Sequence, residues 1–147
     1  MQKLSKKSGS TLIEVLCALA IISIMCSLAM SIHVNNLKLM KYNQEKRRYI
    51  STLEAIKEDI ICNLSYSDII NVYNQNKKFV KRDNLTLSEI SKSGVLGILE
   101  ESINLGNTYV KLDITQGEVL KIELQLNLKL KTGFEVIKTE FYKGNYL

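Results

Sequence analysis

The chain has 147 residues, of which 46% are hydrophobic, and 20 Lys and Arg against 15 Asp and Glu give a formal net charge of +5. This length fits one modest domain and an additional apolar segment. The positive charge is weak evidence for a nucleic-acid partner, because Lys3, Lys6 and Lys7 stand in the first nine residues with no acid among them. The three cysteines do not indicate a disulfide framework, since Cys17 and Cys26 both lie in the apolar segment.

The first predicted element is an apolar helix that begins beside a carboxylate. The three lysines are followed by the sequence GSTLIEVL at residues 9–16, and no residue from Val15 to Ile32 is charged. An acidic side chain at the centre of a bilayer costs about +2.5 to +3.5 kcal/mol on translocon scales. Glu14 therefore needs an explanation, such as a partner that neutralises it.

This arrangement resembles the class III signal of type IV pilins and of the pseudopilins of type II secretion and competence systems. The resemblance implies that a prepilin peptidase cleaves between Gly9 and Ser10 and methylates the new Ser10 amine. It also implies that Glu14 pairs with the amine of a neighbouring subunit, because each group then loses an unpaired buried charge. The implied assembly residues are Thr11, Leu12, Ile13 and Glu14.

Two departures from the family pattern favour a minor pilin or a pseudopilin over an abundant shaft pilin. Ser10 stands where most major pilins have phenylalanine, and the chain contains no proline. The implied partners are other pilin subunits, the prepilin peptidase, the inner-membrane assembly platform and membrane lipid, and no cofactor is implied. The implied location is a single-pass cell membrane protein with a cytoplasmic N-terminus and an extracytoplasmic head, which then joins a surface filament or pseudopilus.

Other interpretations of the apolar segment remain open. An ordinary secretory signal has an h-region of about 7 to 15 residues, and the uncharged stretch is longer. A lipoprotein signal needs a small residue before its cysteine, whereas Met25 precedes Cys26. A plain anchor of a receptor fragment fits the uncharged residues from Val15 to Val34, roughly 30 Å of helix. Cations flank the span on both sides, so charge alone does not set its orientation.

The helical pattern continues well past residue 60, and we expect one helix from Thr11 to about Leu64, roughly 80 Å long. The stretch from Lys38 to Arg48 is polar and cationic. Within it, Lys46, Arg47 and Arg48 predict a solvated collar outside the membrane, with contact to lipid phosphate or DNA as the alternative. Beyond it, five large side chains recur at spacings of three and four residues and predict a buried stripe. The stripe comprises Tyr49, Leu53, Ile56, Ile60 and Leu64.

Residues 65–106 predict a polar connection, in which residues 65–68 end the long helix, Phe79 and Val80 form a short strand, and a helical turn begins near Leu87. The following sequence alternates strictly, with apolar residues from Val110 to Ile114 and at every even position from Leu120 to Leu130. Period two predicts strands with one buried face. Two-residue breaks at Gln116-Gly117 and Thr132-Gly133 predict a meander of three strands. The third strand, Phe134 to Tyr142, changes its apolar parity after Val136, which predicts a bulge.

We therefore predict an α+β, pilin-like fold, in which a long helix, half in the membrane and half soluble, packs on an antiparallel sheet of three to four strands. The predicted parts are a leader at 1–9, a membrane or filament-core half at 10–34 and a soluble head at 35–147. The head comprises helix at 35–64, a variable connection at 65–106 and sheet at 107–147.

The sequence offers no catalytic constellation. His33 has no second ligand three or four residues away, and the glycines at 94 and 97 lack the lysine of a phosphate-binding loop. We therefore expect no enzyme, no metal site and a structural role as a minor pilin or pseudopilin. A competence pseudopilin that helps DNA uptake and a membrane-anchored receptor fragment are the alternatives. DNA is a possible partner that the sequence does not support.

Overall fold

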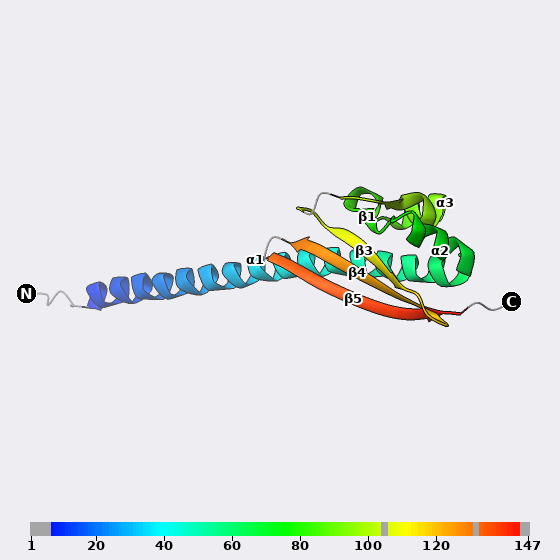
Figure 1. Ribbon diagram of the computed structural model, residues 1–147. Helices are drawn as coiled ribbons and strands as arrows, with labels where there is room; N and C mark the ends of the chain where they lie inside the picture. The colour runs from blue at the N-terminus through cyan, green and yellow to red at the C-terminus, as the bar shows by residue number, and fades with distance from the viewer. Residues whose placement is uncertain (1–6, 104–105, 131–132, 145–147) are drawn as a thin grey trace, which may run out of the picture. The chain divides into compact units, whose positions relative to one another are not determined.

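The computed structural model describes residues 7–103, 106–130 and 133–144, with side chains described from Thr11 onward. It contains two compact units, residues 1–43 and residues 44–147, which are described separately below. Helix α1 (Lys7–Cys62) runs through both units and has 56 residues (Figure 1). The predicted long helix is confirmed, because no proline interrupts it and no glycine follows Gly9 until the helix has ended.

The predicted apolar stripe of α1 forms one side of the core in the second unit. Four of its members are buried, and Leu64 is partly buried against them just beyond the end of the helix. Thr52 is also buried on α1, and its hydroxyl donates a 3.0 Å hydrogen bond to the Arg48 carbonyl oxygen. The buried stripe comprises Tyr49, Leu53, Ile56 and Ile60.

A second helix, α2 (Tyr66–Asn74), begins where the sequence predicted only an end to the first. Ser65 is its N-cap: the Ser65 hydroxyl accepts from the Asp68 amide at 3.2 Å, and the Asp68 carboxylate accepts from the Ser65 amide at 2.9 Å. This reciprocal capping box satisfies two amides that a helix start leaves without partners. The assignment of residues 65–68 as a helix end alone was therefore incomplete.

The described residues contain one five-stranded antiparallel sheet in the order β2-β1-β3-β4-β5. Its strands are β1 (Phe79–Lys81), β2 (Leu99–Glu100), β3 (Tyr109–Thr115), β4 (Leu120–Leu130) and β5 (Gly133–Lys143). The predicted α+β class and the β3-β4-β5 meander are confirmed. The sheet is larger than the predicted three to four strands because β1 and β2, both from the connection, pair beside β3.

Strand β4 lies at the centre of the core. Its even-numbered residues from Leu120 to Leu128 are buried, and its odd-numbered residues face the other side of the sheet. The buried side covers the α1 stripe, together with Val110 and Leu112 of β3 and Phe141 of β5. Figure 1 shows the sheet extended along the part of α1 that belongs to the second unit, with α2 and α3 at one end of it.

Strand β5 corrects two expectations about the last hairpin and its neighbour. It pairs with β4 in continuous register from Gly133 opposite Leu130 to Lys143 opposite Leu120, so the bulge predicted after Val136 is wrong. The parity changes because β5 carries apolar residues on both faces. The connection between β3 and β4 is also four residues long, 116–119, and not two. The second predicted break falls partly on residues 131–132, which lie outside the described residues.

Helix α3 (Leu87–Ile98) is divided by Gly94, whose φ of 62° and ψ of 172° lie where an L side chain is strained. Immediately after this break, the Val95 amide donates a 2.8 Å hydrogen bond to the Asp59 carboxylate of α1. The other oxygen of Asp59 accepts from the Asn63 side-chain amide at 2.6 Å. Asp59, in the last turns of α1, therefore binds the backbone of α3 at the position where α3 is interrupted.

Candidate processing and assembly site

The predicted cleavage site lies at the start of α1. Gly9 and Ser10 are within the helix bounds, Lys7–Cys62, but their side chains lie outside the described residues. The expected cleavage between them and the methylation of the Ser10 amine therefore stay predictions.

The predicted assembly residues begin the described part of the helix and are all exposed. Leu12 is 65% exposed and Ile13 64%, both large apolar side chains. Thr11 and Glu14 flank them, so the structure places all four residues within about one turn of one helix. Glu14 is the one acidic residue in the helix before Glu45.

The N-terminal unit has an apolar surface on every side of its helix. Every side chain from Thr11 to Lys41 is exposed, and the most apolar 18-residue window has a mean hydropathy of 2.5 with none of it buried. The described residues contain one helix that is both long enough and apolar enough to cross a membrane, and it is α1. A helix that is apolar all round is stable only when lipid or other helices surround it.

The polar groups within this apolar stretch are compatible with such surroundings. The Ser23 hydroxyl donates a 2.8 Å hydrogen bond to the Leu19 carbonyl oxygen one turn earlier. An internal bond of this kind removes much of the cost of placing a hydroxyl in hydrocarbon. Cys17 and Cys26 are free thiols on the helix surface, as is Cys62 near the end of α1. Glu14 is thus the group for which an external partner matters most.

The predicted cationic collar contributes to the head as well as facing solvent. Lys46 forms an ion pair with Glu135 of β5, which is 89 positions away in sequence. The guanidinium of Arg48 lies 5.8 Å from the centre of the Tyr49 ring, within the range of a cation–π contact. The expectation of a purely solvated collar therefore holds for only part of the segment.

The opposite end of β5 binds the C-terminal turn of α1. The Lys143 ammonium donates hydrogen bonds to the carbonyl oxygens of Ile60 at 3.0 Å and Ile61 at 2.8 Å. The last carbonyls of a helix lack partners within it and carry partial negative charge. The last turn of α1 contains no basic residue of its own, so Lys143 supplies the cation from a distant strand.

Sequence reasoning missed the roles of Asp59, Glu135 and Lys143. Each acts on a group that lies between 36 and 89 positions away, so no local spacing marks it. The capping box at Ser65 and Asp68 was also missed, although its S-x-x-D spacing is a local signal.

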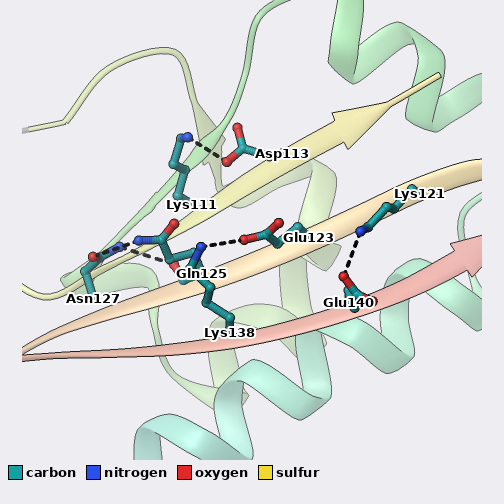
Figure 2. Close-up of polar contacts among 8 residues, drawn as sticks. All are labelled: Lys111, Asp113, Lys121, Glu123, Gln125, Asn127, Lys138 and Glu140. Carbon is teal, nitrogen blue, oxygen red and sulfur yellow. Dashed lines mark hydrogen bonds and ion pairs between the residues drawn. The ribbon is translucent and has the colours of Figure 1, made fainter.

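The outer face of the sheet carries paired charges. Lys138 contacts Glu123 at 2.9 Å, and Lys121 contacts Glu140 at 2.8 Å, each across β4 and β5 (Figure 2). A third pair, Lys111 with Asp113, lies along β3 at 2.6 Å. In each pair the carboxylate neutralises the lysine, so this face is not a uniformly basic surface of the kind that attracts nucleic acid.

Asp68 and Lys121 in the head have shifted pKa values. The pKa of Asp68 is below its ordinary value, mainly because the Ser65 hydroxyl donates a hydrogen bond to its carboxylate, with the Ser65 amide as the next cause. The pKa of Lys121 is above its ordinary value because the Glu140 carboxylate accepts a hydrogen bond from it. Neither group belongs to the apolar segment.

Among the described residues, no group of three His, Cys, Asp or Glu side chains is placed to hold a metal ion.

Comparison with known proteins supports the interpretation of the N-terminus. Residues 4–30 match the family model described as the prokaryotic N-terminal methylation motif, and the chain therefore carries the signature of type IV pilins and pseudopilins. The match covers under a fifth of the chain. No curated protein and no solved structure matches the chain. The motif and the apolar helix together support a pilin-like protein that prepilin peptidase processes and that a single span anchors in the membrane.

Proposed function

We propose that the chain is a minor pilin or pseudopilin subunit, inserted in the membrane as a precursor and assembled into a filament through its N-terminal helix. One observation carries the proposal: Glu14 is exposed, and it is the one charged residue of α1 from Ser8 to Leu37, a stretch whose side chains are apolar on all sides of the helix. Prepilin peptidase removes residues 1–9 and leaves a methylated amine on Ser10. The role is structural and needs no catalytic residue or cofactor.

Assembly follows from the energetics of the two buried charges. When subunits stack with an offset along their helices, the amine of Ser10 in one subunit meets the Glu14 carboxylate of its neighbour. An unpaired charge in an apolar environment is costly, so the pair favours the stacked arrangement over isolated helices. Apolar side chains such as Leu12 and Ile13 fill the surrounding helix contacts, and the head lies outside the apolar layer.

Localisation and partners follow from the same steps. The pilin-type motif, and not the charge distribution, supports a cytoplasmic N-terminus and an extracytoplasmic head. The partners are other pilin subunits, the prepilin peptidase and the inner-membrane assembly platform. DNA uptake is not part of this proposal, because residues 44–147 carry 15 basic and 14 acidic residues and the outer face of the sheet is internally neutralised.

The processing step has a direct test. The chain is produced with and without an active prepilin peptidase, and the N-terminus of the membrane-bound product is determined by mass spectrometry. We expect a product that begins at Ser10 and carries one added methyl group only when the peptidase is active. A Gly9→Val variant should stay uncut, whereas Gln2→Val, as the matched control, should be processed normally. A product that keeps residues 1–9 beside active peptidase would favour a plain membrane-anchored receptor fragment.

A further inference from the structure

Strand β5 forms one edge of the sheet. Among the described strands it pairs with β4 alone, and it is 11 residues long. In an antiparallel sheet, alternate residues of an edge strand direct their amide and carbonyl groups to the open side. Such an edge is a template for pairing with another strand, and proteins normally blunt it with charges, bulges or a short length. β5 is neither short nor bulged.

The outer face of β5 exposes apolar side chains on both sides of a charged pair. Phe134 is 67% exposed, Val136 49% and Tyr142 62%, while Lys138 and Glu140 lie between them. The two faces of this strand differ in what they contact. Phe141 and Ile137 pack toward the core, whereas Phe134, Val136 and Tyr142 are exposed and do not belong to the core cluster. Lys138 precedes Glu140 by two positions, so an antiparallel copy of the same strand can set each of these charges opposite the other.

We propose that β5 pairs antiparallel with β5 of a second copy of this chain, about a two-fold axis at Thr139. In this register Lys138 stands opposite Glu140 of the second copy, and the symmetry repeats this pair. Val136 stands opposite Tyr142 of the second copy, also twice. Opposite charges and aromatic–β-branched pairs are the cross-strand neighbours that stabilise sheets. The strand is therefore complementary to itself in both charge and apolar contact.

Neighbouring registers lack this complementarity. An axis at Lys138 places two lysines opposite each other, and an axis at Glu140 does the same with two glutamates. Like charges directly opposite one another destabilise a strand pair. The two faces of the joined sheet remain continuous only when even-numbered residues stand opposite even-numbered ones. This excludes every register whose two-fold axis passes between two residues. Axes at Ile137 and Phe141 place Lys138 and Glu140 opposite uncharged residues, so among the axes from Ile137 to Phe141 the axis at Thr139 is the one that pairs opposite charges. This register joins two five-stranded sheets into one.

The charges already present on the outer face extend across this junction. Lys138 contacts Glu123 at 2.9 Å and Glu140 contacts Lys121 at 2.8 Å within one head (Figure 2). Pairing places each of these two residues beside its opposite charge in the second copy, so the row of alternating charges continues from one sheet to the next. One strand pair buries less area than a standard protein interface, so the association of two isolated chains is weak.

The direction of β5 determines which copies can meet. Glu135, near its start, contacts Lys46, and Lys143 at its end contacts Ile60 and Ile61, so β5 and the soluble half of α1 run in the same direction. Antiparallel β5 strands therefore set the soluble halves of the two α1 helices antiparallel. Subunits of one filament have parallel helices, so this contact joins two filaments that lie side by side in opposite directions. Only this last consequence rests on the proposed function.

The test uses disulfide cross-linking of the full chain in detergent, with Cys17, Cys26 and Cys62 replaced by alanine. A Thr139→Cys variant places two thiols directly opposite each other, at the Cα separation of about 4.5–5.5 Å that a disulfide accepts. Lys138→Cys is the matched control, because in this register its two copies are diagonal neighbours about 7–8 Å apart. Since Lys138 is the more exposed side chain, random collision would cross-link it more readily. We expect at least about fivefold more dimer from Thr139→Cys.

Charge reversal in the Thr139→Cys chain tests the register itself. Lys138→Glu or Glu140→Lys alone places two like pairs across the junction and should lower the dimer yield at least about threefold. The double reversal, made together with Glu123→Lys and Lys121→Glu so that the two pairs within one head keep opposite charges, restores opposite charges across the junction and should return the yield to within about twofold of the parent. A yield from Lys138→Cys that equals or exceeds that from Thr139→Cys would overturn the proposal, as would a double reversal without recovery.

A second measurement avoids the half-buried Thr139 should its variant fold poorly. Lys138→Cys chains are mixed with Glu140→Cys chains, whose thiols lie directly opposite in the proposed register. The mixture should give more dimer than either chain alone. Equal yields from the mixture and from the separate chains would contradict self-pairing of β5.

Discussion

Replacement of Lys143 by methionine should loosen the end of α1 from the sheet. Lys143 donates hydrogen bonds of 3.0 and 2.8 Å to the carbonyls of Ile60 and Ile61, and α1 has no basic residue in its own last turn. Hydrogen bonds to a charged group contribute about 1.5–3 kcal/mol, and a cation at a helix C-terminus about 0.3–1 kcal/mol. Because the side chain is only half-buried, water replaces part of this stabilisation. We expect the free energy of unfolding to fall by about 1–2 kcal/mol.

The assay is urea unfolding of the full chain in detergent, followed by circular dichroism of the strands and by Tyr fluorescence. Lys92→Met provides a matched control, because Lys92 is 72% exposed and lies 3.8 Å from Glu89 on the same helix. Such a surface pair is worth about 0–1 kcal/mol at most, so the control should change little. If Lys143→Met lowers the free energy of unfolding no more than Lys92→Met does, the capping role assigned to Lys143 is wrong.

Three further outcomes follow from the head. Leu124→Lys places a charge in the core and should make the head protease-sensitive while membrane insertion is retained; wild-type resistance would refute its placement. Gly94→Ala should cost about 1–3 kcal/mol by urea unfolding because its φ is positive, and Gly117→Ala, where φ is not positive, should cost less; equal costs would contradict backbone strain as the cause. Asp68 has a lowered pKa, so its stabilisation is present above the ordinary aspartate pKa and lost as the pH falls through the lowered value. Ser65→Ala should weaken that acid dependence in pH-jump unfolding, and an unchanged profile would remove the capping box as its source.

The core of the fold was predictable because it depends on local periodicity. Spacings of three and four residues from Tyr49 to Ile60 gave the buried face of α1, and strict alternation from Leu120 to Leu130 gave β4. Both patterns arise from the geometry of one element and its burial on one side. The N-terminal segment was predictable for another reason, since its lysines, glycine and single glutamate occur in one short stretch.

The features that sequence did not give depend on contacts between distant positions. Lys46 with Glu135, and Lys143 with the end of α1, join segments more than 80 residues apart, and no local pattern favours them. The short strand predicted at Phe79 and Val80 is confirmed as β1, whereas β2 is two residues long, too short to show a period. The parity change in β5 was visible, but it has two physical explanations, and apolar residues on both faces proved to be the one that applies.

Incorporation of Glu14 variants into filaments tests the central claim most directly. The Glu14→Ala chain, the parent and the control Glu45→Ala, which loses an exposed carboxylate beyond the span, are expressed with the assembly system, and the subunit is quantified in membrane and sheared-fibre fractions. We expect all three in the membrane after processing, with Glu14→Ala nearly lost from the fibres and Glu45→Ala incorporated like the parent. Equal incorporation of Glu14→Ala and the parent would contradict the pairing of this carboxylate with a neighbouring Ser10 amine.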